Sequence, residues 1–82
     1  MRREDGWGER MNSVFPQRLR RLRERDRMDR KKLGECCGLS KSVISKYERG
    51  EREPSASSLE KIADFFDVST DYLLGREKNF IR

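Results

Sequence analysis

The chain has 82 residues, with 20 Lys and Arg against 15 Asp and Glu, so its formal net charge is +5. We expect one small domain with a core of about fifteen side chains, because a chain of this length buries only about 60% of its unfolded surface. It contains neither eighteen consecutive apolar residues nor an apolar segment after the charged start, which argues against a transmembrane span or a secretory signal and predicts a cytoplasmic protein.

The composition argues against an enzyme. The sequence has no histidine, the commonest general base and a frequent zinc ligand. It also lacks a glycine-rich phosphate loop and a recognisable pair of catalytic carboxylates. We therefore predict no catalytic residue, no metal site and no cofactor.

The two cysteines, Cys36 and Cys37, are adjacent and so lack the C-x-x-C spacing of redox and metal sites. We expect a reducing compartment, with Cys37 in the core and Cys36 nearer the surface. A strained vicinal disulfide is the alternative.

Positive charge is concentrated in the middle of the chain. Residues 1–14 carry three charges of each sign, residues 15–50 carry twelve basic and five acidic residues for a net +7, and residues 51–82 carry five and seven for a net −2. A basic segment of this kind indicates a polyanionic partner, with nucleic acid first and an anionic membrane surface second. A solvated helix surface is the plainer alternative.

Residues 1–14 contain two glycines and mixed charge without apolar periodicity, so we expect a flexible N-terminal tail. A domain over residues 15–75 follows, and its first helix is predicted at about 16–26, with Pro16 in the first turn. The apolar residues that recur along one face of this helix are Phe15, Leu19 and Leu22.

Two short helices separated by a glycine turn are predicted next. Asp29 is a good N-cap for a helix over 30–37, and Gly38 supplies a left-handed stop. Ser40 caps a following helix that Gly50 closes. The inward-facing residues of the two helices are Leu33, Cys37, Ile44 and Tyr47.

Pro54 and Ser55 open a fourth helix that ends at Asp67, and a last short helix runs from its cap Ser69 to Gly75. We expect residues 76–82 to form a C-terminal tail. The apolar residues of these two helices are Leu59, Ile62, Ala63, Phe66, Tyr72, Leu73 and Leu74. Five helices without a strand pattern predict an all-α fold.

The segment from Asp29 to Gly50 has the spacing of a DNA-binding helix-turn-helix, with an ordinary corner between two helices as the alternative. Cations stand at the start of both helices, where the helix dipole disfavours them. Cations at these positions become favourable when a bound phosphate completes an anion site at the helix start. The cations are Arg30, Lys31, Lys32 and Lys41.

The second helix of this motif divides into an apolar face and a hydrogen-bonding face. Ile44 and Tyr47 point to the core, and Val43 lies at the boundary. Lysine donates to guanine O6 and N7, and serine donates to or accepts from several bases, so the outer face suits readout of a major groove. Its residues are Lys41, Ser42, Ser45, Lys46 and Arg49.

The run MDRKKLGECCGLSKSVISKYERGEREPS resembles the helix-turn-helix of the phage-repressor (lambda repressor-like, XRE) family, as do the flanking FPQRLRRLRERD and LEKIADFFDVSTDYLLG. The resemblance covers residues 15–75. It is specific because many residues stand at the family's spacing. They are Leu33, Gly38, Ser40, Ile44, Glu48, Arg49, Gly50, Pro54, Ser55, Leu59, Ile62, Ala63, Val68 and Ser69.

The resemblance implies a five-helix lambda repressor-like domain whose third helix enters the major groove, and a homodimer on a near-palindromic operator. It also implies an ion pair between Arg23 of the first helix and Glu48. The residues at the family's base-edge positions are Lys41, Ser42, Ser45 and Lys46, and those near the phosphate backbone are Arg30, Arg49 and Arg52.

Three residues depart from the family's pattern. Arg30 replaces a glutamine that usually touches the DNA backbone, Gly34 replaces an alanine, and Arg27 stands where a glycine or another turn-former often ends the first helix. We expect a stability cost of up to about 1 kcal/mol at each of Gly34 and Arg27.

Apolar residues near the C-terminal end predict a dimer interface, with burial of one or two of them in the core as the alternative. These residues are Phe65, Leu74, Phe80 and Ile81.

Together these patterns predict a sequence-specific DNA-binding transcriptional regulator of prokaryotic or phage type, acting as a repressor that occupies its operator. Two alternatives stay open. One is an antitoxin-like partner of another protein with secondary DNA binding. The other is a nonspecific nucleic-acid-binding module, which would need the basic charge but not the identities of Ser42 and Ser45.

Overall fold

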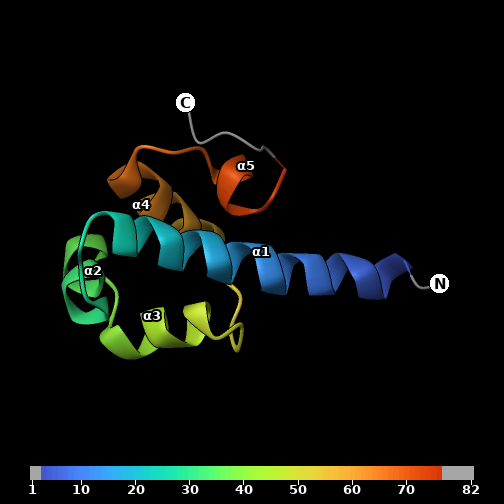
Figure 1. Cartoon of the computed structure of the whole chain (residues 1–82), viewed down its shortest axis with the longest axis horizontal. Coiled ribbons are helices and arrows are strands. Elements are labelled where there is room, and N and C mark those ends of the chain that lie inside the picture. Colours follow the sequence, from blue (N-terminus) through green and yellow to red (C-terminus); the bar gives the residue numbers. More distant parts are fainter. Residues whose placement is uncertain (1–2, 77–82) are drawn as a thin grey trace.

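The computed structural model describes the backbone of residues 3–76 and the side chains of residues 14–76. This part of the chain contains five α-helices and no strand, which confirms the predicted all-α class (Figure 1). The helices are α1 (Arg3–Arg25), α2 (Arg30–Cys37), α3 (Lys41–Glu48), α4 (Ala56–Phe66) and α5 (Thr70–Leu73).

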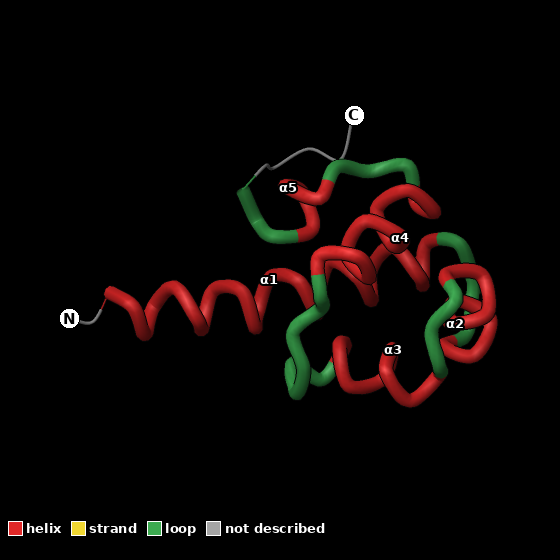
Figure 2. The backbone as a smooth tube through the Cα atoms, turned by 180° about the vertical axis from the view of Figure 1, so that it is seen from behind, coloured by secondary structure: helices red, strands yellow, loops and turns green. Residues whose placement is uncertain are grey.

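The first helix is much longer than the apolar periodicity predicts. It begins at Arg3 instead of Pro16, so the prediction was wrong about its start, and Pro16 lies inside the helix. The added turns extend away from the other four helices (Figure 2). Extending an existing helix costs far less than nucleating one, so added turns can form without an apolar stripe. Apolar spacing in the sequence therefore does not mark them.

Each of the four later helices begins at the predicted cap. In each case the side-chain oxygen of the cap accepts a hydrogen bond from the backbone N–H three residues further on, over 2.7–3.1 Å. These bonds satisfy donors that the first helical turn leaves without a partner. The capping residues are Asp29, Ser40, Ser55 and Ser69.

One core joins all five helices. Helix α1 packs against α3 on one side and α5 on the other, α2 contacts α3 and α4, and α4 contacts α5. Every apolar residue assigned to the core from the sequence lies in it or packs against it, and Val68 joins them. The largest fully buried side chains are Leu19, Leu33, Val68, Ile44, Ile62 and Leu73.

Two arginines of α1 are held by contacts within the fold. The Arg18 guanidinium lies 4.2 Å from the centre of the Tyr72 ring. Its Nη1 donates to the Tyr72 carbonyl at 2.5 Å, so this side chain joins α1 to α5. The second is Arg23, which is 8% exposed.

Two of the departures from the family pattern occupy special backbone positions. Arg27 has a φ of 57°, in the left-handed region that glycine adopts at lower cost. At Gly34, a Cβ atom would lie 2.5 Å from the carbonyl oxygen of Leu39. The expectation that glycine merely weakens α2 at this position was therefore incomplete, because the close approach of the following turn favours a residue without a Cβ.

Among the described residues, no helix has the length and apolar character needed to cross a membrane.

Candidate nucleic-acid interface

The turn between α2 and α3 fixes the relative positions of the two helices. Gly38 has a φ of 70° and ends α2, and the Leu39 N–H then donates to the Gly34 carbonyl at 2.7 Å. Ser40 caps α3 immediately afterwards. The bare backbone at Gly34 allows this turn to approach α2 closely, so the two helices form a compact helix-turn-helix.

Helix α3 has one buried and one solvent-facing side, as predicted from its sequence. Ile44 is fully buried and Tyr47 is 2% exposed, and the Tyr47 ring packs edge-on against Phe15 of α1 with 5.6 Å between ring centres. Val43 at the boundary packs partly against the core. The packing therefore fixes the rotation of α3 about its own axis.

The four predicted base-reading residues lie together along α3, away from its packed side. Lys41, Ser42 and Lys46 are exposed, and Ser45 is half-buried. All four carry hydrogen-bond donors, and the serine hydroxyls also accept. A major groove admits one α-helix, and base edges present the donors and acceptors that such groups can pair with.

The arginine at the end of α3 is engaged by a neighbouring acid. Arg49 Nε and Nη2 donate to the two carboxylate oxygens of Glu51 at 2.9 and 3.0 Å. This hydrogen bonding raises the pKa of Arg49 and lowers the pKa of Glu51 relative to their ordinary values. Both side chains are exposed, so the pair is open to exchange with another anion. Arg52 is exposed nearby in the sequence.

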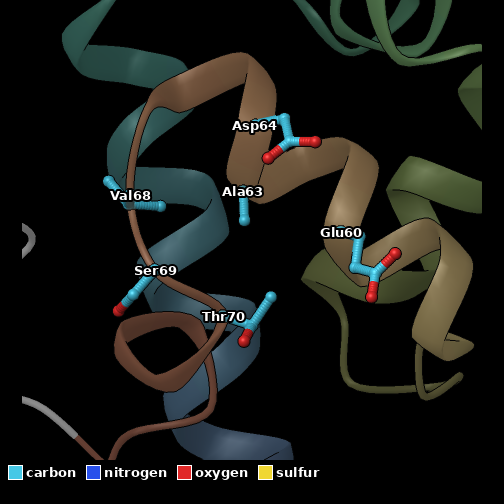
Figure 3. A pocket seen from close by; sticks show the side chains of 6 residues that line it. All are labelled: Glu60, Ala63, Asp64, Val68, Ser69 and Thr70. Atoms are coloured by element: carbon cyan, nitrogen blue, oxygen red, sulfur yellow. The ribbon is translucent and has the colours of Figure 1, made fainter. Parts of the chain in front are cut away.

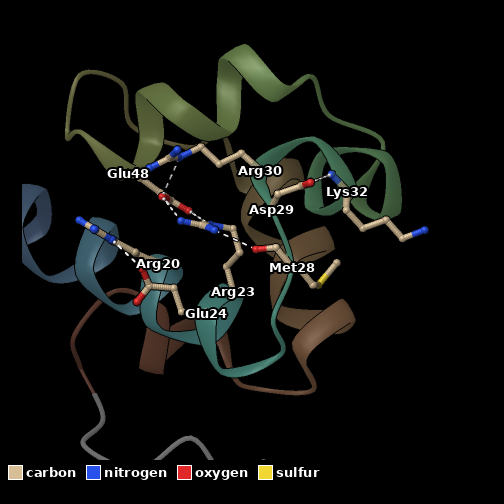
Figure 4. A network of polar contacts seen from close by, with 8 residues as sticks. All are labelled: Arg20, Arg23, Glu24, Met28, Asp29, Arg30, Lys32 and Glu48. Atoms are coloured by element: carbon tan, nitrogen blue, oxygen red, sulfur yellow. Dashed lines mark hydrogen bonds and ion pairs between the residues drawn. The ribbon is translucent and has the colours of Figure 1, made fainter.

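A buried ion pair joins α1 to the end of α3 (Figure 4). Arg23 Nε and Nη2 donate to the two oxygens of Glu48 at 2.6 and 3.0 Å, and Nη1 donates to the Met28 carbonyl at 2.8 Å. The hydrogen bond with Glu48 raises the pKa of Arg23. The Glu48 side chain is only 2% exposed, so the pair fastens the end of α3 to α1.

Glu48 has a second arginine partner that the sequence did not predict. Arg30, the first residue of α2, donates from Nε to Glu48 Oε1 at 3.1 Å, and its side chain is 40% exposed. The two residues are eighteen positions apart, and no helical or strand period connects them. Only the packing of α2 on α3 brings them together.

The predicted dimer residues lie in different surroundings. Phe65 is 40% exposed and stands edge-on to Phe66, with 5.0 Å between ring centres. Leu74 is half-buried and packs against the core. Phe80 and Ile81 lie outside the described residues.

The two cysteines are free thiols in different environments, as predicted. Cys36 is exposed and Cys37 is 5% exposed. Burial raises the pKa of the Cys37 thiol from 9.0 to about 11. Both residues border a hollow of about 350 Å³ beside Phe65, which Lys61 and Asp64 also line.

A second hollow, of about 380 Å³, lies between α4 and the start of α5 (Figure 3). Its ionisable side chains are the carboxylates of Glu60 and Asp64, and Ser69 and Thr70 add hydroxyl groups. Carboxylates repel phosphate, so this hollow is a poor candidate for contact with a nucleic-acid backbone.

The geometry defines the class of protein as a helix-turn-helix domain of the DNA-binding type. The family model described as "Helix-turn-helix" matches residues 19–73. The chain therefore belongs to the helix-turn-helix family, in the lambda repressor-like (XRE) group that its sequence resembles.

Curated relatives of the chain are transcriptional regulators. The HTH-type transcriptional regulator AnsR of Bacillus subtilis is 41% identical over 61 residues, which cover 74% of this chain and 53% of AnsR. The uncharacterized HTH-type transcriptional regulator YazB of the same organism is 31% identical over 65 residues, covering 79% of this chain and 94% of YazB. The chain spans about half the length of several other curated relatives it matches.

Solved structures share the arrangement of helices. The P22 c2 repressor protein, in complex with a synthetic operator, superposes with a TM-score of 0.75 at 31% identity, covering 79% of this chain and 98% of the repressor. The restriction-modification controller protein C.AhdI from Aeromonas hydrophila gives a TM-score of 0.70 at 31% identity, covering 79% of this chain and 96% of C.AhdI.

Proposed function

We propose that this chain is a sequence-specific transcriptional repressor that occupies a near-palindromic DNA operator as a homodimer. The observation that carries the proposal is the division of α3. Its packed side is anchored by Ile44 and Tyr47, whereas its outer side offers only polar and charged groups to solvent apart from the partly packed Val43. A helix held in this way presents a fixed set of donors to a groove.

Base readout is assigned to the outer side of α3. Lys41 and Lys46 donate to guanine O6 and N7, and the hydroxyl groups of Ser42 and Ser45 serve several bases as donor or acceptor. The P22 c2 repressor was solved with a synthetic operator, and its structural similarity supports the same mode of binding here.

Phosphate contacts are assigned to three arginines at the edges of the helix-turn-helix. Arg30 begins α2, and Arg49 and Arg52 follow α3. Each phosphate neutralised by a cation releases counterions, so affinity will fall steeply as salt rises. Such contacts set the orientation of the domain on DNA without reading its sequence.

A homodimer follows from the expected operator symmetry. One recognition helix per chain reads one half-site, and two half-sites about one helical turn, or about 34 Å, apart require two chains. We assign Phe65 to the contact between chains because it is a large apolar side chain at the surface. Leu74, Phe80 and Ile81 complete the proposed set.

The experiment that tests this function is selection of binding sites from random duplex DNA with purified protein at near-physiological salt. We expect enrichment of an inverted repeat, whose symmetry reports the dimer. Transcription from a promoter that carries this repeat should then fall when the protein is added. Recovery of unenriched DNA would contradict sequence-specific binding and favour a nonspecific nucleic-acid module or a protein-binding partner.

A further inference from the structure

The Glu48 carboxylate accepts hydrogen bonds from two arginines on different helices (Figure 4). Arg23 of α1 meets it with two nitrogens, and Arg30 of α2 meets it with Nε at 3.1 Å. Glu48 is 2% exposed, Arg23 is 10% exposed and Arg30 is 40% exposed by side chain. The cluster therefore has a buried centre and one arginine that reaches solvent.

Arg23 already satisfies the charge of Glu48. Two nitrogens of its guanidinium donate to the two carboxylate oxygens, which is the geometry that arginine and carboxylate prefer. The third nitrogen donates to the Met28 carbonyl. Arg30 adds a second positive charge, so the three side chains together carry a net +1. The buried carboxylate does not need Arg30 for neutrality, and the surplus charge lies at the solvent-facing edge.

The contact with Glu48 also restricts Arg30. A free arginine side chain samples many rotamers and loses this freedom when it binds a ligand. Here one nitrogen is already fixed against a carboxylate that is itself held by Arg23. The contact uses Nε, and the two terminal nitrogens of the guanidinium carry its other four donors.

We propose that Glu48 is a positioning residue for DNA binding, which holds the Arg30 guanidinium ready to donate its terminal nitrogens to a phosphate. This inference rests on the proposed function, because it assigns a role to Arg30 within the same protein–DNA contact. The buried ion pair then does more than join α1 to α3. It also links the end of the recognition helix to a phosphate contact at the start of α2.

Exchange of Arg30 for lysine separates positioning from charge. Lysine keeps the positive charge, but its ammonium has a single nitrogen, whereas arginine can bind Glu48 through Nε and extend two other nitrogens. We expect Arg30→Lys to weaken binding to the selected operator by about tenfold with little change in the salt dependence. The matched control is Arg52→Lys, which we expect to weaken binding by about twofold or less.

A double-mutant cycle tests the role of Glu48 directly. The operator affinities of the parent chain, Glu48→Gln, Arg30→Ala and the double variant are measured at a temperature where circular dichroism shows each one folded. We expect Glu48→Gln to weaken binding in the parent and to have a several-fold smaller effect once Arg30 is absent. Equal effects in both backgrounds would mean that Glu48 acts through the fold alone and would overturn the proposal.

The outcomes distinguish this inference from the proposed function. If the parent chain selects no operator, the proposed function is wrong and this inference falls with it. If the parent chain selects an operator but Arg30→Lys binds as the parent does, only the positioning role is overturned. If Glu48→Gln does not fold, the comparison of Arg30→Lys with Arg52→Lys decides the question.

Discussion

Arg49 and Glu51 form a two-point ion pair just after α3, with N–O distances of 2.9 and 3.0 Å. The pair occupies the Nε edge of the guanidinium, which is one of the edges that arginine presents to a phosphate. If Arg49 contacts a phosphate as proposed, Glu51 competes with DNA for this side chain. Because both side chains are exposed, the pair itself contributes little to stability.

Glu51→Gln should raise the affinity for DNA, because it releases the Arg49 donors and removes a negative charge from the interface. We expect a gain of several-fold and a steeper dependence of affinity on salt, measured by fluorescence anisotropy at several salt concentrations. Glu53→Gln is the matched control, since Glu53 is an exposed acid in the same loop. Equal gains in the two variants would show that net charge, and not release of Arg49, is responsible.

Local signals account for most of what the sequence predicts correctly. The caps Asp29 and Ser40 and the left-handed stop at Gly38 act within a few residues, and apolar spacing marks the side of a helix that packs. These signals locate α2 and α3 and divide α3 into its two sides. They are also the features that place the candidate interface.

Features that the sequence does not predict depend on contacts between distant segments or on turns that lack an apolar stripe. Arg30 reaches Glu48 only through the packing of α2 on α3. The close approach of the Leu39 carbonyl to Gly34 is likewise a tertiary distance. The turns of α1 before Pro16 extend a helix whose apolar pattern begins later, so periodicity detects only its packed part.

Lys46→Ala and Arg52→Ala should alter DNA binding in different ways. Removing a base contact costs about 1–3 kcal/mol and relaxes the preference at one base position, which we expect for Lys46. Removing a phosphate contact weakens all sequences alike and lowers the salt slope by about one, which we expect for Arg52. Affinities for the selected operator and for random DNA, each measured across a salt series, distinguish the two. Equal losses on both DNAs for Lys46→Ala would contradict its base-reading role.

Arg27→Gly should stabilise the fold. At a φ of 57° an L-residue with a side chain is disfavoured by about 1–2 kcal/mol, of which the flexibility of glycine in the unfolded chain offsets about half. We expect a gain of up to about 1 kcal/mol and a rise of several degrees in Tm by thermal denaturation. Arg21→Gly, at an exposed position inside α1, should instead lower the free energy of unfolding by about 1 kcal/mol. A loss of stability in Arg27→Gly would show that the arginine side chain contributes more than its backbone strain costs.

Arg23→Ala should destabilise the fold strongly, because it leaves the buried Glu48 carboxylate without its two-point partner. We expect a loss of about 3 kcal/mol or more in the free energy of unfolding, measured by urea denaturation. Arg20→Ala is the control, since the Arg20–Glu24 pair on the same helix is exposed at both side chains and should contribute less than about 0.5 kcal/mol. Similar losses in the two variants would contradict a special role for the buried pair.

Cys37 should make the stability of the fold fall between about pH 9 and pH 11. Burial raises the pKa of its thiol from 9.0 to about 11, so in this range the unfolded chain holds a thiolate while the folded chain keeps the proton. The unfolded state then binds fewer protons, and the free energy of unfolding decreases as pH rises, by an amount of order 2 kcal/mol at pH 11. This contribution is fully present below pH 9.

The measurement is urea denaturation at intervals from pH 8 to pH 11, with the parent chain compared with Cys37→Ala and Cys36→Ala. Lysine and tyrosine groups also titrate in this range, so the informative quantity is the difference in pH dependence between variants. Cys37→Ala should lose the thiol-dependent decline, and Cys36→Ala, altered at an exposed position, should retain it. A decline of the same size in Cys37→Ala as in the parent would show that the buried thiol does not ionise on unfolding in this range.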